Sequence, residues 1–185
     1  ADFRIEMDGI AAALRNPALL GAIQSGPRGQ IAVTLFLWSN GQTQVVELPW
    51  RLLASAGDLE LTARQVEAIE RKLPPGGTGL AAAMDFAADL LDASPYAADR
   101  REIDISGDGE DNEGGSAGAA RDEALARGIT INGLPVTSGS KLLVKYYRDQ
   151  VIGGADAFIE PAETIMHFRD SILKKLLREI SRPVS

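Results

Sequence analysis

Two glycine-rich loops carry the oxygen-bearing side chains that could do chemistry in this chain. Residues 76–79 place the hydroxyl of Thr78 at a tight turn directly before a predicted helix. Residues 106–112 concentrate carboxylates directly after a predicted strand. Sites built only from carboxylates, hydroxyls and water suit Mg²⁺, Mn²⁺ or Ca²⁺, and they leave a position open for an incoming carboxylate. Both loops therefore supply candidate ligands for a divalent cation.

Each loop also has a simpler interpretation, in which Thr78 is only a helix N-cap and the acidic loop is a solvated turn.

Two other types of ion or phosphate site fit these loops poorly. Residues 104–109 match the start of a calcium-binding helix-loop-helix loop, but Gly115 stands at the twelfth position, where a bidentate Glu is required. Residues 76–79 lack the Lys of a P-loop and the spacing of a dinucleotide-binding loop.

Composition narrows the class of protein. The chain has 185 residues, of which 45% are hydrophobic, and this balance fits one globular domain. The net charge of −7 and the lack of a basic stripe lead us to expect no nucleic-acid partner. The absence of cysteine excludes disulfides, thiolate metal sites and cysteine nucleophiles. No apolar stretch reaches the roughly 18–20 residues of a membrane span, so we expect no membrane insertion.

Apolar periodicity predicts the elements that position the two loops. Helical spacing predicts helices at residues 2–14, 18–23, 58–73, 80–92, 117–127, 142–149 and 164–180. Apolar or alternating runs predict strands at residues 31–38, 44–48, 101–106, 129–136 and 157–160. Asn40-Gly41 predicts a tight hairpin, Pro49 is expected to end the second strand, and Pro74-Pro75 stiffens the loop before Thr78.

This order of elements predicts a doubly wound α/β fold. Its sheet is expected to be mostly parallel, with one antiparallel edge strand and helices on both faces. Ligands of such sheets bind beyond the carboxyl ends of the strands, where both glycine-rich loops are expected to lie.

Four segments spread along the chain resemble a bacterial, functionally uncharacterised family of von Willebrand factor A-like domains. They are Gly77-Thr78-Gly79 before a helix, residues 103–109 after a strand, residues 128–135 and residues 146–154. The similarity covers nearly the whole of residues 1–185 as a single domain. It implies a Rossmann-like three-layer α/β sandwich.

The resemblance also implies a metal-ion-dependent adhesion-type site for Mg²⁺, or Mn²⁺ or Ca²⁺. By position, Thr78 and Asp108 match two of the superfamily's three ligand loops. Neighbouring side chains are candidates for the surrounding shell or for partner contacts: Ser106, Glu110, Asp111 and Asn112. The third loop, an Asp-x-Ser-x-Ser motif after the first strand, has no match in this sequence.

In the superfamily that first strand lies in the middle of the sheet. The resemblance therefore implies that the chain is N-terminally incomplete, and that upstream residues supply the strand, its Asp and Ser ligands and an export signal. We accordingly expect a periplasmic or extracellular location. An alternative registration treats Asp104-Ile105-Ser106-Gly107-Asp108 as the Asp-x-Ser-x-Ser motif itself, with its last Ser replaced. The elements before residue 104 would then have no place in the fold.

Three functions remain open. The first is a binding module whose metal recruits an acidic side chain of a protein partner. The second is a Mg²⁺-dependent hydrolase or phosphotransfer enzyme that uses Asp104 and Asp108, which alternation points to the same side of the strand. The third is a metal-free interaction scaffold that binds through a flat apolar patch.

The remaining conspicuous side chains have structural interpretations. His167 has no visible acid–base partner, and Trp38 and Trp50 are expected to be packing groups. The cations of the last helix are expected to form its solvated face: Lys174, Lys175 and Arg178.

Overall fold

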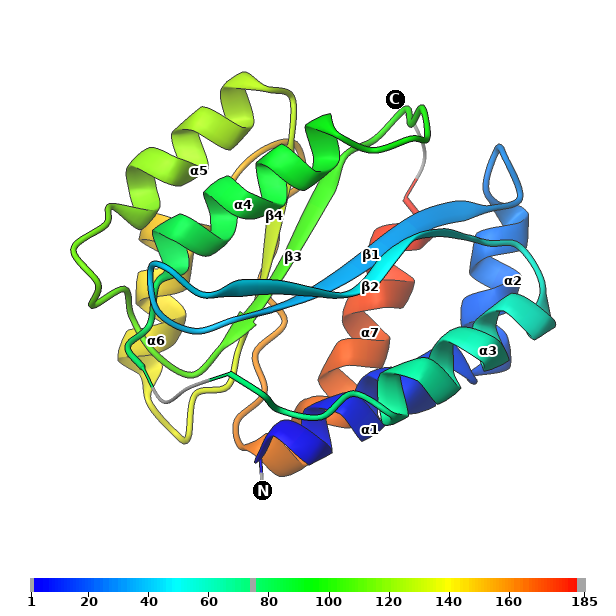
Figure 1. Ribbon diagram of the computed structural model, residues 1–185, viewed down its shortest axis with the longest axis horizontal. Helices are drawn as coiled ribbons and strands as arrows, with labels where there is room; N and C mark the ends of the chain where they lie inside the picture. Colours follow the sequence, from blue (N-terminus) through cyan, green and yellow to red (C-terminus); the bar gives the residue numbers. More distant parts are fainter. Residues whose placement is uncertain (1, 74–75, 183–185) are drawn as a thin grey trace.

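The computed structural model describes residues 2–73 and 76–182 (Figure 1). The predicted Pro74-Pro75 turn lies outside these residues. The helices are α1 (Asp2–Leu14), α2 (Pro17–Ser25), α3 (Ala56–Glu67), α4 (Leu80–Asp92), α5 (Ala117–Ala126), α6 (Lys141–Tyr146) and α7 (Phe168–Ile180). The strands are β1 (Ile31–Trp38), β2 (Gln44–Leu53), β3 (Glu102–Gly107) and β4 (Thr130–Pro135).

The predicted α/β architecture is confirmed, and its sheet comes in two pieces. β1 and β2 form an antiparallel hairpin, whereas β3 and β4 pair in parallel. The predicted strand at residues 157–160 contributes only an isolated bridge, between Gly133 and Ile159. Within the described residues β1 pairs only with β2 and β3 pairs only with β4, so the second edges of β1, β2 and β3 are open, whereas β4 makes isolated bridges on its other side.

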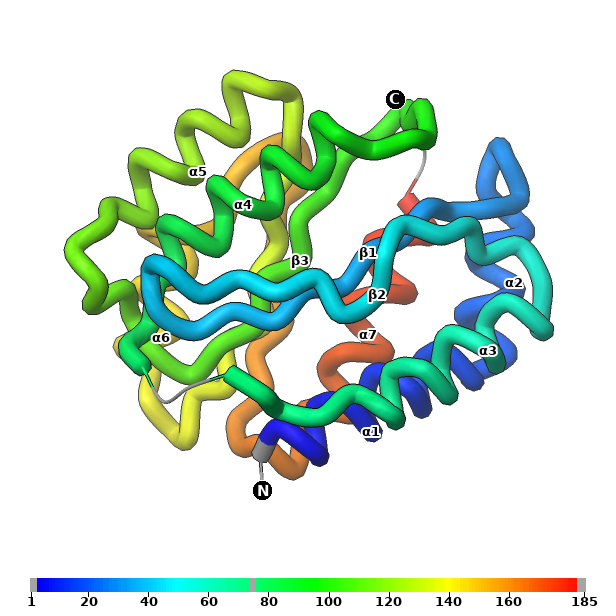
Figure 2. Tube along the Cα trace, viewed as in Figure 1, coloured from blue at the N-terminus to red at the C-terminus, as the bar shows by residue number. Residues whose placement is uncertain are grey.

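Helices cover both faces of the strand layer (Figures 1 and 2). On one side, α4 and α5 pack on β3 and β4 around a core that includes Met84, Ile105 and Ile131. On the other side, α1, α2, α3 and α7 form a second core with the hairpin. The chain is therefore a three-layer sandwich.

Three elements differ from their predicted bounds, each for a local reason. β2 continues past Pro49, because this residue lies where the β1–β2 register shifts and no ladder hydrogen bond is needed. α3 ends at Glu67, and the Ile69 N–H then bonds to the Val66 carbonyl in a turn that buries Ile69. α6 passes into a π-helix, Tyr147–Val151, whose wide turn buries Tyr147.

The prediction that Lys175 belongs to the solvated face of α7 is wrong. Lys174 and Arg178 are exposed, but Lys175 is 0% exposed and its ammonium group contacts the carboxylate of Asp104 on β3. A buried lysine is stable when a counter-charge compensates for its lost hydration. The helical pattern alone could not reveal this, because the partner lies 71 positions away.

A slot separates the two pieces of the sheet. We use this name for the space between β1 and β3, which together line two cavities of about 600 and 630 Å³. All eight residues of β1 are half-buried, as expected for a strand with one face packed and one edge open. The first cavity lies toward the start of β3, and the second reaches the loops that follow β1 and β3.

Candidate functional site

The two predicted metal ligands meet at one end of the slot. Thr78 and Asp108 both line the 630 Å³ cavity. Their loops are in direct contact, because a Cβ added at Gly109 would lie 2.9 Å from the Thr78 hydroxyl oxygen. The fold thus brings together two residues that are 30 positions apart, at the carboxyl end of β3, as the sequence predicts.

Close backbone contacts hold the Thr78 loop in place. The Gly79 N–H donates to the Ser39 carbonyl at 2.7 Å, directly after β1. The Thr78 N–H donates to the side-chain oxygen of Asn112 at 2.7 Å, and the Asn112 N–H donates to the Thr78 carbonyl at 3.0 Å. A Cβ at Gly79 would lie 2.6 Å from the carbonyl carbon of Asn40, so only glycine fits at this position. The hairpin turn and the acidic loop therefore position Thr78 jointly.

The acidic loop also caps the helix that follows Thr78. One carboxylate oxygen of Asp111 accepts from the Ala81 N–H at 2.8 Å, in the first turn of α4. The Asp111 N–H in turn donates to the Tyr146 hydroxyl at 3.1 Å. The N-cap of α4 is Gly79, which has no side chain to cap the helix, so the interpretation of Thr78 as a simple N-cap is wrong. Asp111 and Asn112 organise the site, whereas Glu110 is exposed at its rim.

Buried hydroxyl groups surround the meeting point of the two loops. The side-chain oxygens of Ser39, Ser106 and Tyr147 are buried, and none has a hydrogen-bond partner in the described part of the chain. Ser39 and Ser106 line the same cavity as Thr78 and Asp108. Buried polar groups are nearly always hydrogen-bonded in native proteins. These three oxygens therefore mark a place where a further group belongs.

Sequence reasoning missed Ser39 and Tyr147. Ser39 directly follows β1, and the rule that selects residues just after strands would have found it. Tyr147 reaches the site from the π-helix, since a Cβ at Gly107 would lie 2.9 Å from its hydroxyl. Burial, and then the charge of Asp108, raise the pKa of Tyr147, so its hydroxyl stays protonated and can donate a hydrogen bond.

The donor atoms around Thr78 and Asp108 are of the kind that a divalent cation prefers. They are hydroxyl oxygens and the Asp108 carboxylate, and such hard oxygen donors suit Mg²⁺. Within the described ranges, no group of three His, Cys, Asp or Glu side chains could hold a metal ion. Asp104 lines the cavity too, but its carboxylate is engaged by Lys175. These types of donor atom suit Mg²⁺, but the cation needs at least one anionic ligand besides Asp108.

Replacing Asn112 with alanine is expected to lower the free energy of unfolding by about 1 kcal/mol, because the Thr78 N–H loses its acceptor. Urea denaturation measures the loss. Gln42→Ala, at an exposed position in the hairpin turn, is the matched control and is expected to change stability by less than about 0.5 kcal/mol. Equal effects of the two substitutions would contradict the role given to Asn112.

The sequence of residues 1–184 matches the model of a family described as "Protein of unknown function (DUF1194)". The chain belongs to this family. No curated protein matches this DUF1194 chain. Within the described residues, no helix is both long and apolar enough to cross a membrane.

Solved structures show the fold of this DUF1194 protein. Proximal thread matrix protein 1 from the mussel byssus superposes with a TM-score of 0.68 at 13% identity, over 97% of this chain and 42% of that one. The present chain therefore spans about two fifths of that protein. BatB from Bacteroides thetaiotaomicron gives a TM-score of 0.57 at 15% identity, over 96% of this chain and 88% of that one.

A third structure, described as an aerotolerance-related membrane protein from Bacteroides fragilis, gives a TM-score of 0.54 at 16% identity. It covers 94% of this chain and 88% of that one. The DUF1194 protein thus has the von Willebrand factor A-like α/β fold. At these identities the likeness speaks for the fold alone.

Proposed function

We propose that this DUF1194 domain is a protein-binding module assisted by a divalent metal, with Thr78 and Asp108 as two of the metal ligands. The observation that carries the proposal is their convergence in one cavity beside buried hydroxyls that lack partners. Mg²⁺ is the preferred ion, and Mn²⁺ or Ca²⁺ are substitutes with the same preference for oxygen. When bound, the ion would link the domain to a carboxylate of its partner.

The electrostatics of the rim support a role for metal in this binding. Glu110 and Glu113 are exposed on the acidic loop, and the chain carries a net charge of −7. An acidic partner would be repelled by this surface unless a cation lay between the two carboxylates. Binding of such a partner is therefore expected to require the ion. We propose that the hydroxyl of Ser106, which lines the cavity, and the exposed side chain of Glu110 contact the ion's water or the partner.

A strand placed in the slot would bring a further anionic ligand to the site. We propose that the expected Asp-x-Ser-x-Ser strand fills the slot between β1 and β3 and brings its ligands to Thr78 and Asp108. The open edges of β1 and β3 could each accept its backbone hydrogen bonds. Phe3 and Met7 of α1 line the same cavity as Thr78, so a strand in the slot would pack against this helix. Export of the protein remains part of this proposal.

The test is calorimetric titration of Mg²⁺ and of Mn²⁺ into the full-length natural protein and its Asp108→Ala variant. Saturable binding is expected in the parent and a loss of at least about tenfold in affinity in the variant, because a charged ligand is removed. Glu70→Ala, which removes an exposed carboxylate that does not line the cavity, should bind as the parent does. If the parent binds neither ion, the metal-assisted mechanism is wrong and a metal-free interaction scaffold becomes the better proposal.

A further inference from the structure

A buried cluster of ionisable side chains lies at the other end of the slot, where α7 packs on β3 and β4. Its centre is Asn132 of β4, which is 0% exposed. The side-chain nitrogen of Asn132 lies 3.3 Å from a carboxylate oxygen of Glu102 and also donates to Glu179, while its oxygen accepts from the Phe158 N–H at 3.1 Å. One nitrogen atom therefore brings two carboxyl groups together.

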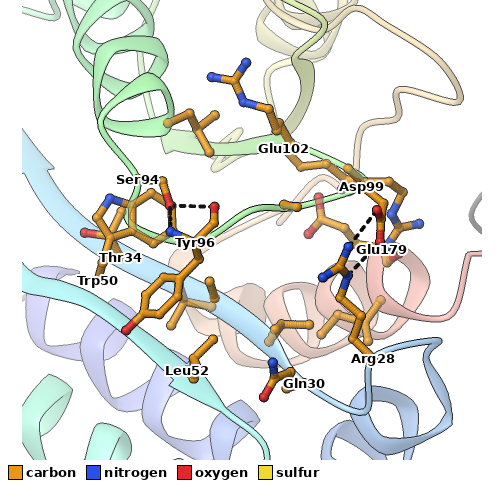
Figure 3. Close-up of a pocket in the computed structure, with 18 of the residues that line it drawn as sticks. Arg28, Gln30, Thr34, Trp50, Leu52, Ser94, Tyr96, Asp99, Glu102 and Glu179 are labelled. Carbon is orange, nitrogen blue, oxygen red and sulfur yellow. Dashed lines mark hydrogen bonds and ion pairs between the residues drawn. The ribbon is translucent and has the colours of Figure 1, made fainter.

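The pair is buried and tied to the end of α7. Glu179 is 7% exposed, and the side chain of Glu102 is 16% exposed. Both line the 600 Å³ cavity, and Figure 3 shows Glu179 at the end of this cavity, near the ion pair of Arg28 and Asp99. Since two like charges this close repel strongly when desolvated, the geometry favours a single negative charge on the pair.

The surrounding cations act on the two carboxyl groups, but each of them also has other partners. Arg100 approaches Glu102 at 3.5 Å, and it donates two further N–H groups to the carbonyls of Glu179 and Arg182. Lys175, the buried cation of α7, contacts Asp104, and its charge also interacts with Glu179 and Glu102. The remaining cations of this region, Arg178 and Arg182, stack on the ring of Phe158 at 4.1 and 4.6 Å.

We propose that Glu102 and Glu179 share one proton, and that this protonated pair is a latch that fastens the carboxyl-terminal part of α7 to β3 and β4. Loss of the proton places two carboxylates against one buried amide. The repulsion is relieved when the end of α7 moves away from β3, which opens the 600 Å³ cavity that both residues line. The latch does not depend on the proposed metal site, because it lies at the opposite end of the slot.

The proton affinities of the cluster agree with the latch. Burial, followed by the hydrogen bond and charge of Glu179, raises the pKa of Glu102 from 4.5 to about 8. The stability that protonated Glu102 contributes is therefore fully present below pH 4.5 and is lost as the pH rises through 8. Burial lowers the pKa of Lys175 from 10.5 to about 8, so this residue contributes stability that returns between pH 8 and 10.5. The two effects together predict a stability minimum near pH 8.

Thermal unfolding between pH 5 and 9 tests the latch. The midpoint of the parent is expected to fall by about 5 °C or more between pH 5 and pH 8. Glu102→Gln, which keeps the hydrogen bonds but cannot lose a proton, is expected to remove more than half of this fall. The control Glu70→Gln changes an exposed carboxylate and should follow the parent. An identical fall in Glu102→Gln and in the parent would overturn the proposal.

A second measurement needs no variant. Carboxyl ¹³C NMR of the unaltered protein is expected to show one Glu resonance that titrates near pH 8. Amide exchange at residues 175–182, corrected for its intrinsic pH dependence, is expected to accelerate above that pH. Complete titration of every Glu below pH 6 would overturn the shared proton.

Discussion

Replacing Lys175 with alanine is expected to lower the free energy of unfolding by about 2–5 kcal/mol, as is usual when a long, fully buried side chain is truncated to alanine. The substitution removes the cation that contacts the partly exposed Asp104 carboxylate. It also leaves a void where a fully buried side chain had been. Equilibrium urea denaturation at pH 7 measures the loss.

The neighbouring residue provides the control. Lys174→Ala removes the same side chain one position earlier in α7, where it is exposed, and is expected to change stability by less than about 0.5 kcal/mol. The double variant Asp104→Asn with Lys175→Met removes both charges and should recover much of the loss, because no unpaired charge remains. A loss below about 1 kcal/mol for Lys175→Ala would contradict the burial of the Lys175 side chain.

Substitution of Gly79 by alanine is expected to destabilise the protein by about 1–3 kcal/mol and to displace Thr78. The new Cβ would lie 2.6 Å from both the Asn40 carbonyl carbon and the Gly41 nitrogen, and neither backbone atom can rotate away. The loop would have to move away from the hairpin turn, which carries Thr78 with it. Urea denaturation measures the stability, and Mg²⁺ titration of the full-length protein measures the effect on the site.

Substitution of Gly21 is the control for the substitution of Gly79. It lies in α2, and a Cβ there would meet no atom within 4 Å. Gly21→Ala is therefore expected to stabilise the protein by about 0.5–1 kcal/mol, because alanine has the higher helix propensity. If both glycine substitutions stabilised the protein, the close contact between the Thr78 loop and the hairpin would be wrong.

The sequence contained most of the fold because its strongest patterns are local. Strand-length apolar runs and the Asn40-Gly41 turn predicted the hairpin, and the family resemblance implied that Thr78 and Asp108 belong to one site; the two residues line one cavity. Long-range pairings were not predictable in this way. The burial of Lys175 depends on Asp104, and the proximity of Tyr147 to the site depends on a π-helix that has the same residue pattern as an ordinary helix.

The roles of the individual side chains in the acidic loop could not be predicted from the sequence either. Five of its seven residues were candidates for the metal ligands or their surroundings, but the role of each side chain depends on which backbone N–H groups lie near it. Asp111 binds the first turn of α4 and Asn112 binds the backbone of Thr78, so these two side chains are held by the protein itself. Asp108 lines the cavity instead and is available to a ligand.

The open edges of β1 and β3 have a further consequence for the behaviour of the isolated domain in concentrated solution. Each edge presents a row of backbone donors and acceptors that a strand from a neighbouring molecule could pair with. The hairpin adds exposed Val45 and Val46 to the same layer. A strand that filled the slot would thus cover the facing edges of β1 and β3 and reduce self-association, as well as supply the ligand proposed for the metal site.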